Sequence, residues 1–417
     1  MLKKLRANLV ITPWTIWLGF MGLILLAGLA AGIIVFWKGL GITNLTDLVP
    51  WGLWITIDLS SIALAAGAFS ICAGVYLFGL KRYQPIARTA TFVGLIGYTM
   101  AMLALLLDIG KPERFWKALV YWNTHSLLWE VTMCVMLYLS VLVLESLPIF
   151  ANFEWFRKRY PKLASRMAHV HHYAPFLAII GLGLSSLHQS SLGATYGVIK
   201  ARPFWFKPEM AVLFMFSAIV GGMSLTLFAS MLASRLTNKA RINDALIERA
   251  AKFVGYLLIG YFYFRAWDAL AQIYTYDPGR TEGLRLMTSG PLAFNFWVVE
   301  ILLGMIVPMF LLLYKPTRIN PFWRMTALFL VAAGVVAFRW DTNISGFLVV
   351  MPTLASQIIA YTSYTPSLVE IITGAAIIAY GLTAFSLGVL YLRVVDNTLI
   401  EEEHVIVKVE AGEIVRI

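Results

Sequence analysis

Long apolar runs recur along the whole chain, and they constrain its fold more than any other feature. A helix needs about 20 consecutive apolar residues to cross a bilayer, because each residue adds about 1.5 Å to its length. Ten such runs can be marked, and we predict that each is a transmembrane helix. They are residues 14–36, 51–80, 85–107, 124–147, 172–191, 210–234, 247–273, 292–314, 322–340 and 368–392. The expected fold is an all-α polytopic membrane protein.

The composition excludes the main alternatives to this fold. Hydrophobic residues make up 60% of the 417 residues, and charged residues make up only 13%. A soluble domain could not bury so many apolar side chains. A closed β-barrel is excluded because the runs are too long and do not alternate. The formal net charge of +11 does not indicate nucleic acid binding, because the basic residues cluster between the spans.

Basic residues also predict the orientation. The connections on the side of both termini hold more Lys and Arg, with clusters at 81–88, 157–166 and 235–249. Such loops usually face the cytoplasm. The N-terminal segment is basic and then apolar, with no small-residue cleavage site, so we expect an uncleaved first helix. We predict a multi-pass protein of the cytoplasmic (inner) membrane with both termini in the cytoplasm.

Ionisable residues inside the spans carry the functional signal, because a charge in hydrocarbon is costly and usually functional. In the predicted orientation nearly all of them fall in the outer half of the membrane. They are Asp58, Asp108, His125, Glu130, His188, Asp268, Glu300, Arg339 and Asp341. Their shared depth predicts one polar site, or a few connected sites, near the outer surface.

Three of these residues are candidates for proton exchange. Asp58 lies about two turns inside the second span, PWGLWITIDLSSIALAAGAF, which begins near Trp51. His125 and Glu130 lie on the predicted fourth span, about 140° apart around the helix, so they would face different neighbours. A histidine near a carboxylate can exchange protons at neutral pH. The alternatives are an interhelical hydrogen bond for Asp58 and an interfacial position without a role for His125.

A second group of residues suits a quinone carbonyl. The fifth span ends in LSSLHQSSLG, where His188, Gln189 and Ser190 offer hydrogen-bond donors and acceptors. The serine could instead cap the helix end. Arg339, in FRWDTN at the end of the ninth span, could also donate to a carbonyl, or could pair with Asp341 in a structural salt bridge.

Resident metal centres are not expected. Cys72 and Cys134 are too few for an iron–sulfur cluster, which takes about four thiolates. His125 and His188 could form an outer haem pair, but the inner histidines at 169–172 come from a single segment. No Walker loop, Rossmann fingerprint, zinc spacing or serine-hydrolase elbow stands out. We therefore expect no haem, iron–sulfur cluster or other metal in this chain.

The outer connections are long, and we place them at 108–123, 192–209, 274–291 and 341–367. The segment 341–367 is apolar but too broken to span. It could bind a partner protein, or it could be a re-entrant loop over the protein's own helices. The tail 393–417 alternates in HVIVKVEAGEIVRI, which favours a short hairpin or an added strand on a cytoplasmic partner, or a loosely ordered tail.

These motifs, in this order, resemble those of the NrfD or polysulfide-reductase membrane-subunit family. The resemblance rests on PWGLWITIDLSSIALAAGAF, DIGKPERFWKALVYWNTHSLLWEV, APFLAIIGLGLSSLHQSSLG and RWDTN, and it extends from about residue 50 to 345. The ten-span HybB-like and DsrP-like branch fits best. The motifs are fairly specific, because several occur in the right order.

The resemblance implies a haem-free subunit that binds menaquinone or ubiquinone as a substrate and is not an enzyme alone. It implies an iron–sulfur, ferredoxin-like partner at the outer face, further membrane and cytoplasmic subunits of a respiratory complex, and contact with lipid. Sulfur metabolism (DsrP-like) and hydrogen metabolism (HybB-like) both remain open. The expected division is 1–50, a first four-helix bundle at 51–191, a loop at 192–209, a second four-helix bundle at 210–340, a loop at 341–367, a last helix at 368–392 and the tail.

The resemblance also assigns site residues. The candidates for the quinone site or a proton path are Asp58, His125, Glu130, His188 and Arg339, and we add Trp51, Gln189 and Ser190 as quinone contacts. The alternative function is an ion- or proton-translocating module without its own quinone chemistry. The acidic cluster has no counterpart in the inner half, where Glu145 and the histidines at 169–172 are the only candidates. This asymmetry favours the redox subunit.

Overall fold

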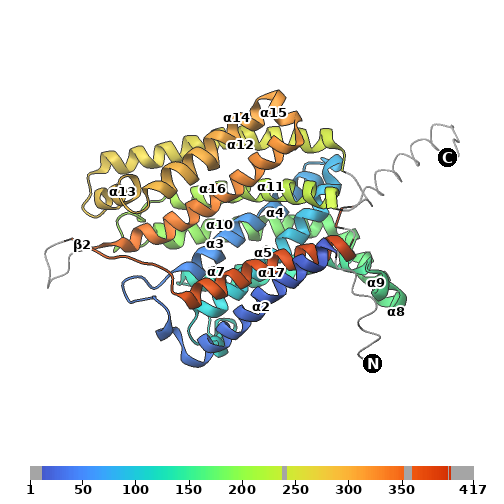
Figure 1. Ribbon diagram of the computed structural model, residues 1–417, viewed down its shortest axis with the longest axis horizontal. Coiled ribbons are helices and arrows are strands. Elements are labelled where there is room, and N and C mark those ends of the chain that lie inside the picture. Colours follow the sequence, from blue (N-terminus) through green and yellow to red (C-terminus); the bar gives the residue numbers. More distant parts are fainter. Residues whose placement is uncertain (1–11, 237–241, 352–358, 393, 396–417) are drawn as a thin grey trace.

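The computed structural model describes residues 12–236, 242–351, 359–392 and 394–395. In this part of the chain, long helices run side by side from one end of the molecule to the other, and one short pair of strands lies at one end (Figure 1). The fold is all-α, as predicted.

The elements follow the predicted spans. In chain order they are α2 (Pro13–Lys38), η2 (Leu40–Ile42), α3 (Leu53–Ala65), α4 (Gly67–Tyr76), η3 (Lys81–Tyr83), α5 (Gln84–Asp108), η4 (Pro112–Arg114), α6 (Lys117–Val120), α7 (Leu127–Ala151), α8 (Glu154–Arg159), α9 (Pro161–His169), η5 (Val170–Tyr173), α10 (Ala174–Gly197), α11 (Met210–Leu236), α12 (Asp244–Thr275), α13 (Arg280–Thr288), the π-helix η6 (Asn295–Ile306), α14 (Val307–Leu313), α15 (Lys315–Ile319), α16 (Pro321–Leu348), β1 (Val349–Val350), β2 (Ala360–Tyr361) and α17 (Leu368–Tyr391).

Among the described residues, nine helical segments are long and apolar enough to cross a membrane. They overlap nine of the ten predicted spans. The remaining prediction, 247–273, falls in α12, a 32-residue helix that runs alongside the others (Figure 1) but contains the charged residues Arg265 and Asp268. The chain is therefore a multi-pass integral membrane protein.

The second span crosses α11 at very short range. It consists of α3 and α4, which meet at Ala66. A Cβ atom added to Gly67 would lie 2.1 Å from the backbone oxygen of Gly222 in α11. A larger residue at position 67 would push these helices apart. The small residues that follow Asp58 in the sequence thus permit close helix packing.

The helices form three groups by contact. The first contains α3, α4, α5, α7 and α10, and the second contains α11, α12, η6, α14 and α16. The third is the pair of α2 and α17, which packs against α3 and α5. The division into two four-helix bundles that the resemblance implies stays a prediction; we call these two groups the first and the second bundle.

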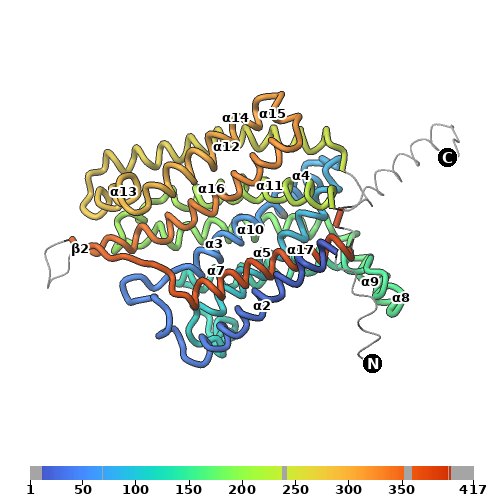
Figure 2. The backbone as a smooth tube through the Cα atoms, in the orientation of Figure 1, coloured from blue at the N-terminus to red at the C-terminus, as the bar shows by residue number. Residues whose placement is uncertain are grey.

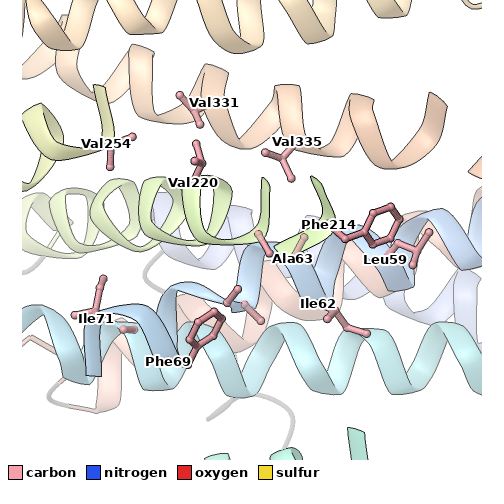
Figure 3. Packing of buried hydrophobic residues seen from close by; sticks show 14 of the residues in the cluster. Leu59, Ile62, Ala63, Phe69, Ile71, Phe214, Val220, Val254, Val331 and Val335 are labelled. Carbon is pink, nitrogen blue, oxygen red and sulfur yellow. The ribbon is translucent and has the colours of Figure 1, made fainter. Parts of the chain in front are cut away.

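The bundles join through a continuous apolar core. Helix α11 packs on α3, α4 and α10, and α16 packs on α3. Figure 3 shows Val220 of α11 between the side chains of α3 and α4 and those of α16, including Ala63 and Val331. Because α11 contributes to both sides of this junction, the two bundles share one buried core.

The two ends of the helices differ. At one end, which we call the loop end, lie the long connections 39–52, 109–126, 198–209 and 276–294, together with residues 349–351 and 359–367. At the other, which we call the terminal end, α2 begins and α17 ends, and α8, α9 and α15 lie there too (Figures 1 and 2). At the loop end β1 pairs with β2, with Val349 opposite Tyr361.

Three predicted boundaries are wrong. Helix α16 continues to Leu348, so the loop predicted at 341–367 begins later, and α10 continues to Gly197 into the loop predicted at 192–209. Helix α7 begins at Leu127, because the Ser126 hydroxyl accepts the backbone N–H of Trp129 (3.4 Å) and caps the helix there. His125 therefore lies outside the helix. The predictions for the tail concern residues that are almost all outside the described part of the chain.

Candidate functional site

Buried polar side chains gather in the loop-end half of the helices. Asp58 lies near the start of α3, His188 lies in the second half of α10, and Arg339 lies near the end of α16. They belong to two groups. The interbundle cluster contains Trp51, Asp58, Tyr98, His188, Gln189, Tyr196, Arg339 and Asn343. The second-bundle charge network contains Lys207, Arg265, Asp268, Gln272 and Glu300.

Asn343 holds the interbundle cluster together. Its amide nitrogen donates to the backbone oxygens of Trp51 (3.2 Å) and Gly52 (3.1 Å) and to Oγ1 of Thr56 (3.1 Å). Its Oδ1 accepts the hydroxyl of Tyr196 at 2.9 Å. One amide thus connects α16 to the start of α3 and to the end of α10. These bonds position the first turns of the second span.

The Trp51 side chain packs inside an aromatic group. Its ring stacks on Trp205, with centroids 6.3 Å apart and planes at 22°. It meets Tyr196 edge-on at 5.5 Å and Phe347 edge-on at 5.7 Å. Trp205 is itself fixed, because its Nε1 donates to the backbone oxygen of Thr342 at 2.6 Å. These rings form one wall of the cluster at the loop end.

His188 and Gln189 each use one polar atom and leave another unpaired. The Nδ1 atom of His188 lies 2.9 Å from the hydroxyl of Tyr98, and the Gln189 amide nitrogen donates to the backbone oxygen of Ile62 at 3.0 Å. Within the described residues, His188 Nε2 and Gln189 Oε1 are buried without a hydrogen-bond partner. An unsatisfied buried polar group costs about 1–3 kcal/mol. Such atoms therefore indicate where water or a ligand binds.

Asp58 and Arg339 show the same pattern. Asp58 is 3% exposed, and its Oδ1 has no partner in the described part of the chain. Arg339 donates to the backbone oxygen of Phe214 (2.8 Å) and to the Ser217 hydroxyl (3.0 Å), while its Nε and Nη1 are buried without a described partner. Asn343, four residues after Arg339 on α16, donates to Gly52 and Thr56 at the start of α3, the helix that carries Asp58. The two charged groups therefore lie on neighbouring helices that are joined at the loop end.

The alternative of a salt bridge between Arg339 and Asp341 is wrong. No ion pair joins them within the described residues; Asp341 instead accepts the side-chain amide of Asn295 at 2.8 Å. Residues two apart on a helix point about 200° away from each other. Arg339 faces α11, and its guanidinium lies 3.6 Å from the ring centre of Phe214.

The second-bundle charge network consists of paired charges. Arg265 donates to Asp268 Oδ2 (2.6 Å) and to Glu300 Oε1 (2.7 Å). Lys207 binds the other oxygen of Asp268, which also accepts from Gln272 at 3.1 Å. All five side chains are buried. Burial lowers the pKa of Lys207, and the neighbouring Asp268 carboxylate, which raises this pKa, offsets only part of that effect.

Three sequence candidates lie outside both groups. His125 is exposed in the turn before α7. Glu130 is half-buried and accepts the Ser191 hydroxyl at 2.8 Å. Ser190 donates to the backbone oxygen of Ser186 on its own helix at 2.8 Å. Ser190 is not at a helix end, so it does not cap α10.

Four residues of these groups were not predicted from the sequence: Tyr98, Tyr196, Lys207 and Gln272. Tyr98 and Tyr196 carry no signal there, because a tyrosine in a span is commonly a packing residue. Lys207 has no predicted role, because it lies in a connection outside the predicted spans. Lys207 follows three aromatic residues in FWFKPEM, shortly before the predicted span 210–234. Those aromatic neighbours were the available signal, because a lysine is otherwise mostly exposed.

Comparison with known proteins places the chain in a family. Residues 41–351, which contain both groups, match the family model described as "Polysulphide reductase, NrfD". The chain is 31% identical over 397 residues to "Menaquinone reductase, integral membrane subunit" of Nitratidesulfovibrio vulgaris, with 92% of each chain covered. It is 27% identical over 377 residues to "Hdr-like menaquinol oxidoreductase integral membrane subunit" of Archaeoglobus fulgidus, which covers 87% of this chain and 89% of the relative. It is also 28% identical over 232 residues to "Probable Ni/Fe-hydrogenase 2 b-type cytochrome subunit" of Escherichia coli, with 53% of this chain and 56% of the relative covered.

Proposed function

Because this chain belongs to the NrfD family of polysulphide reductase proteins, we propose that it is the quinone-reactive membrane subunit of a respiratory oxidoreductase complex. It exchanges electrons between a membrane quinone, menaquinone or ubiquinone, and an iron–sulfur, ferredoxin-like subunit bound at the loop end. The loop end is then the outer face, and both termini are cytoplasmic. The observation that carries this proposal is the set of unpaired buried polar atoms in the interbundle cluster.

These atoms have the chemistry that a quinone headgroup requires. A quinone carbonyl accepts hydrogen bonds, and the hydroxyl of the reduced form also donates them. Arg339 supplies unpaired donors, Gln189 supplies an unpaired acceptor, and His188 Nε2 can serve as either, depending on its tautomer. Asp58 can accept when ionised and donate when protonated. The residues present therefore fit this substrate.

When bound, the quinone supplies the redox chemistry, in which reduction to quinol takes up two electrons and two protons. Asp58 and His188 hold and transfer these protons at Oδ1 and Nε2. Tyr98 fixes the imidazole through Nδ1, so that Nε2 is free for the substrate. Arg339, held by α11, places a fixed positive charge beside a carbonyl oxygen on which negative charge develops.

We assign a role in proton transfer also to Glu130 and His125, which lie nearer the loop end. Glu130 is half-buried and bonded to Ser191, and His125 is exposed. In the proposal they exchange protons between the cluster and the outer solution. The same end carries exposed aromatic side chains in 108–123, including Trp116, Tyr121 and Trp122. These rings support a docking surface for the iron–sulfur subunit, and residues 359–367 lie at the same end.

The test is quinol-linked electron transfer by the purified complex with the variants Asp58→Asn and Glu130→Gln. We expect Asp58→Asn to lower turnover by about 10²-fold or more, as loss of a positioned acid or base does, and Glu130→Gln to lower it less. Asp47→Asn, the same change at an exposed carboxylate, is the control. The size of the complex on a native gel reports assembly. Full activity of both variants in an intact complex would refute the assignment.

A second candidate, a proton-translocating module, rests on a separate observation. A cavity of about 300 Å³ near the terminal end is lined by residues that include Arg88, Glu145 and His171. Tyr138 lies next to the interbundle cluster, because its ring centre is 4.8 Å from that of Tyr98. Tyr98 in turn forms a hydrogen bond with His188. If this function holds, proteoliposomes without quinone will conduct protons, and Glu145→Gln will abolish the current. If the unaltered protein carries no such current, the proton-translocating function is rejected and the redox function is retained.

A further inference from the structure

A larger cavity lies near the terminal end, on the opposite half of the molecule from the interbundle cluster. It has a volume of about 490 Å³, and α4, α10, α11 and α12 all contribute to its walls. We call it the lateral groove. Phe69 and Ile71 come from α4, Leu182 from α10, Met223 from α11, and Phe253 and Leu257 from α12. The groove therefore lies where the first bundle meets the second.

The interior of the groove suits a hydrocarbon chain. Its lining is almost entirely apolar, and the hydroxyl of Ser70 donates within α4, to the backbone oxygen of Ala66 at 3.2 Å. The volume falls within the range of about 300–1,000 Å³ that is common for pockets enclosing a ligand. Phe253 (52%) and Phe78 (75%) are exposed at its edge. Since α12 runs among the membrane-spanning helices, this edge is open to lipid.

Basic residues stand at one end of the groove. Arg82 lines it, is exposed, and has its guanidinium 5.2 Å from the ring centre of Tyr83. Arg249 and Lys252 are exposed on α12, next in sequence to the lining residues Ala250 and Phe253. Within the described ranges, none of these three cations forms an ion pair. Unpaired cations beside an apolar groove at a membrane surface attract an anionic headgroup.

We propose that the lateral groove binds an anionic phospholipid, with one acyl chain between the bundles and the phosphate at Arg82 and the basic residues of α12. An isoprenoid quinone tail would fill the groove equally well, but it brings no anion and leaves the three cations uncompensated. Because the lining comes from both bundles, the bound lipid fills space at their junction. This inference does not depend on the proposed quinone chemistry.

The test uses the full chain with its co-purifying subunits, delipidated in detergent, and native mass spectrometry after addition of phosphatidylglycerol or phosphatidylcholine. We expect one phosphatidylglycerol to remain bound where phosphatidylcholine dissociates. Arg82→Glu should weaken this retention on the order of fivefold for each unit of charge changed. Arg157→Glu, at an exposed arginine of α8 at the same end, should leave it unchanged.

A second variant tests the acyl-chain site without changing the charge of the groove. Met223→Trp fills the groove and leaves all three cations in place, so it should also release the phospholipid. Equal retention of both lipids, insensitive to Arg82→Glu and to Met223→Trp, would overturn the proposal. It would also be overturned if Met223→Trp released quinone and left phosphatidylglycerol bound, because the groove would then hold the quinone tail.

Discussion

The interbundle cluster and the second-bundle charge network are two buried polar groups at similar depth, yet they differ in how their charges are balanced. In the network, Lys207 and Arg265 each contact a carboxylate. In the cluster, Arg339 binds a backbone oxygen and a hydroxyl, and Asp58 has no cationic partner among the described residues. A paired buried charge is already compensated, whereas an unpaired buried charge requires a further partner, such as a bound ligand or water. In the proposed function, the cluster is the binding site and the network is a structural element.

Removing one arginine from each group is the strongest test of this comparison. Arg265→Met leaves Asp268 and Glu300 with one cation, Lys207, so we expect the free energy of unfolding to fall by about 3–5 kcal/mol. Arg339→Met deprives no carboxylate of an ion-pair partner, so its cost should be smaller, but binding of a quinone-site inhibitor should be lost. Unfolding in mixed micelles and inhibitor titration measure the two effects, with the exposed Arg157→Met as control. Equal destabilisation by both variants would contradict the distinction.

The pairing of Tyr98 with His188 should affect turnover rather than stability. His188→Phe removes the unpaired Nε2, and we expect quinol-linked turnover to fall by about 10²-fold. Tyr98→Phe should lower it less and shift its pH profile, because the imidazole stays but its tautomer is no longer fixed. Steady-state rates between pH 6 and 9 measure this, with the size of the complex on a native gel as the check on assembly. Unchanged rates for His188→Phe would place the substrate elsewhere.

Asn343 provides a structural contrast inside the cluster itself. Asn343→Ala removes the bonds to Trp51, Gly52, Thr56 and Tyr196, and we expect a loss of about 2 kcal/mol in unfolding free energy, since several buried groups lose their partner. Thr56→Val, which removes one of these bonds, should cost about 1 kcal/mol or less. Unfolding in mixed micelles compares the two. A larger loss for Thr56→Val would show that the amide is not the central contact.

The last prediction concerns the surface at the loop end. Replacing both Trp116 and Trp122 by Ala should weaken binding of the iron–sulfur subunit by roughly 1–3 kcal/mol, since exposed aromatic rings often dominate an interface. Co-purification at increasing salt measures this. Exposed aromatic residues at the opposite end, such as Trp155 in α8, provide the matched control. If the Trp155→Ala variant loses the partner instead, the subunit docks at the terminal end.

Much of the fold could be predicted because membrane helices are encoded locally. A run of about 20 apolar residues spans a bilayer whatever surrounds it, so nine predicted spans overlap spanning helices. Ends of helices were less predictable. His125 was placed on a helix because the run of apolar residues is ambiguous there, whereas the Ser126 cap decides where α7 starts. Helix α16 extends to Leu348 because its last turns are buried against other elements.

By itself the sequence determined that this is a polytopic membrane protein, which residues are charged within its spans, and that these lie toward one end of the helices. Those properties depend on residue type and position along one helix. Only the tertiary structure decided which charges are paired. Asp268 and Glu300 share Arg265, which brings together two helices, and Lys207 reaches them from a loop 61 residues away from Asp268 in the chain. Arg339 keeps unpaired atoms because α11 offers it a backbone oxygen and a hydroxyl rather than a carboxylate, and Asp58 forms no ion pair with any described residue. Partners of this kind come from packing between distant segments, and no local pattern in the sequence specifies them.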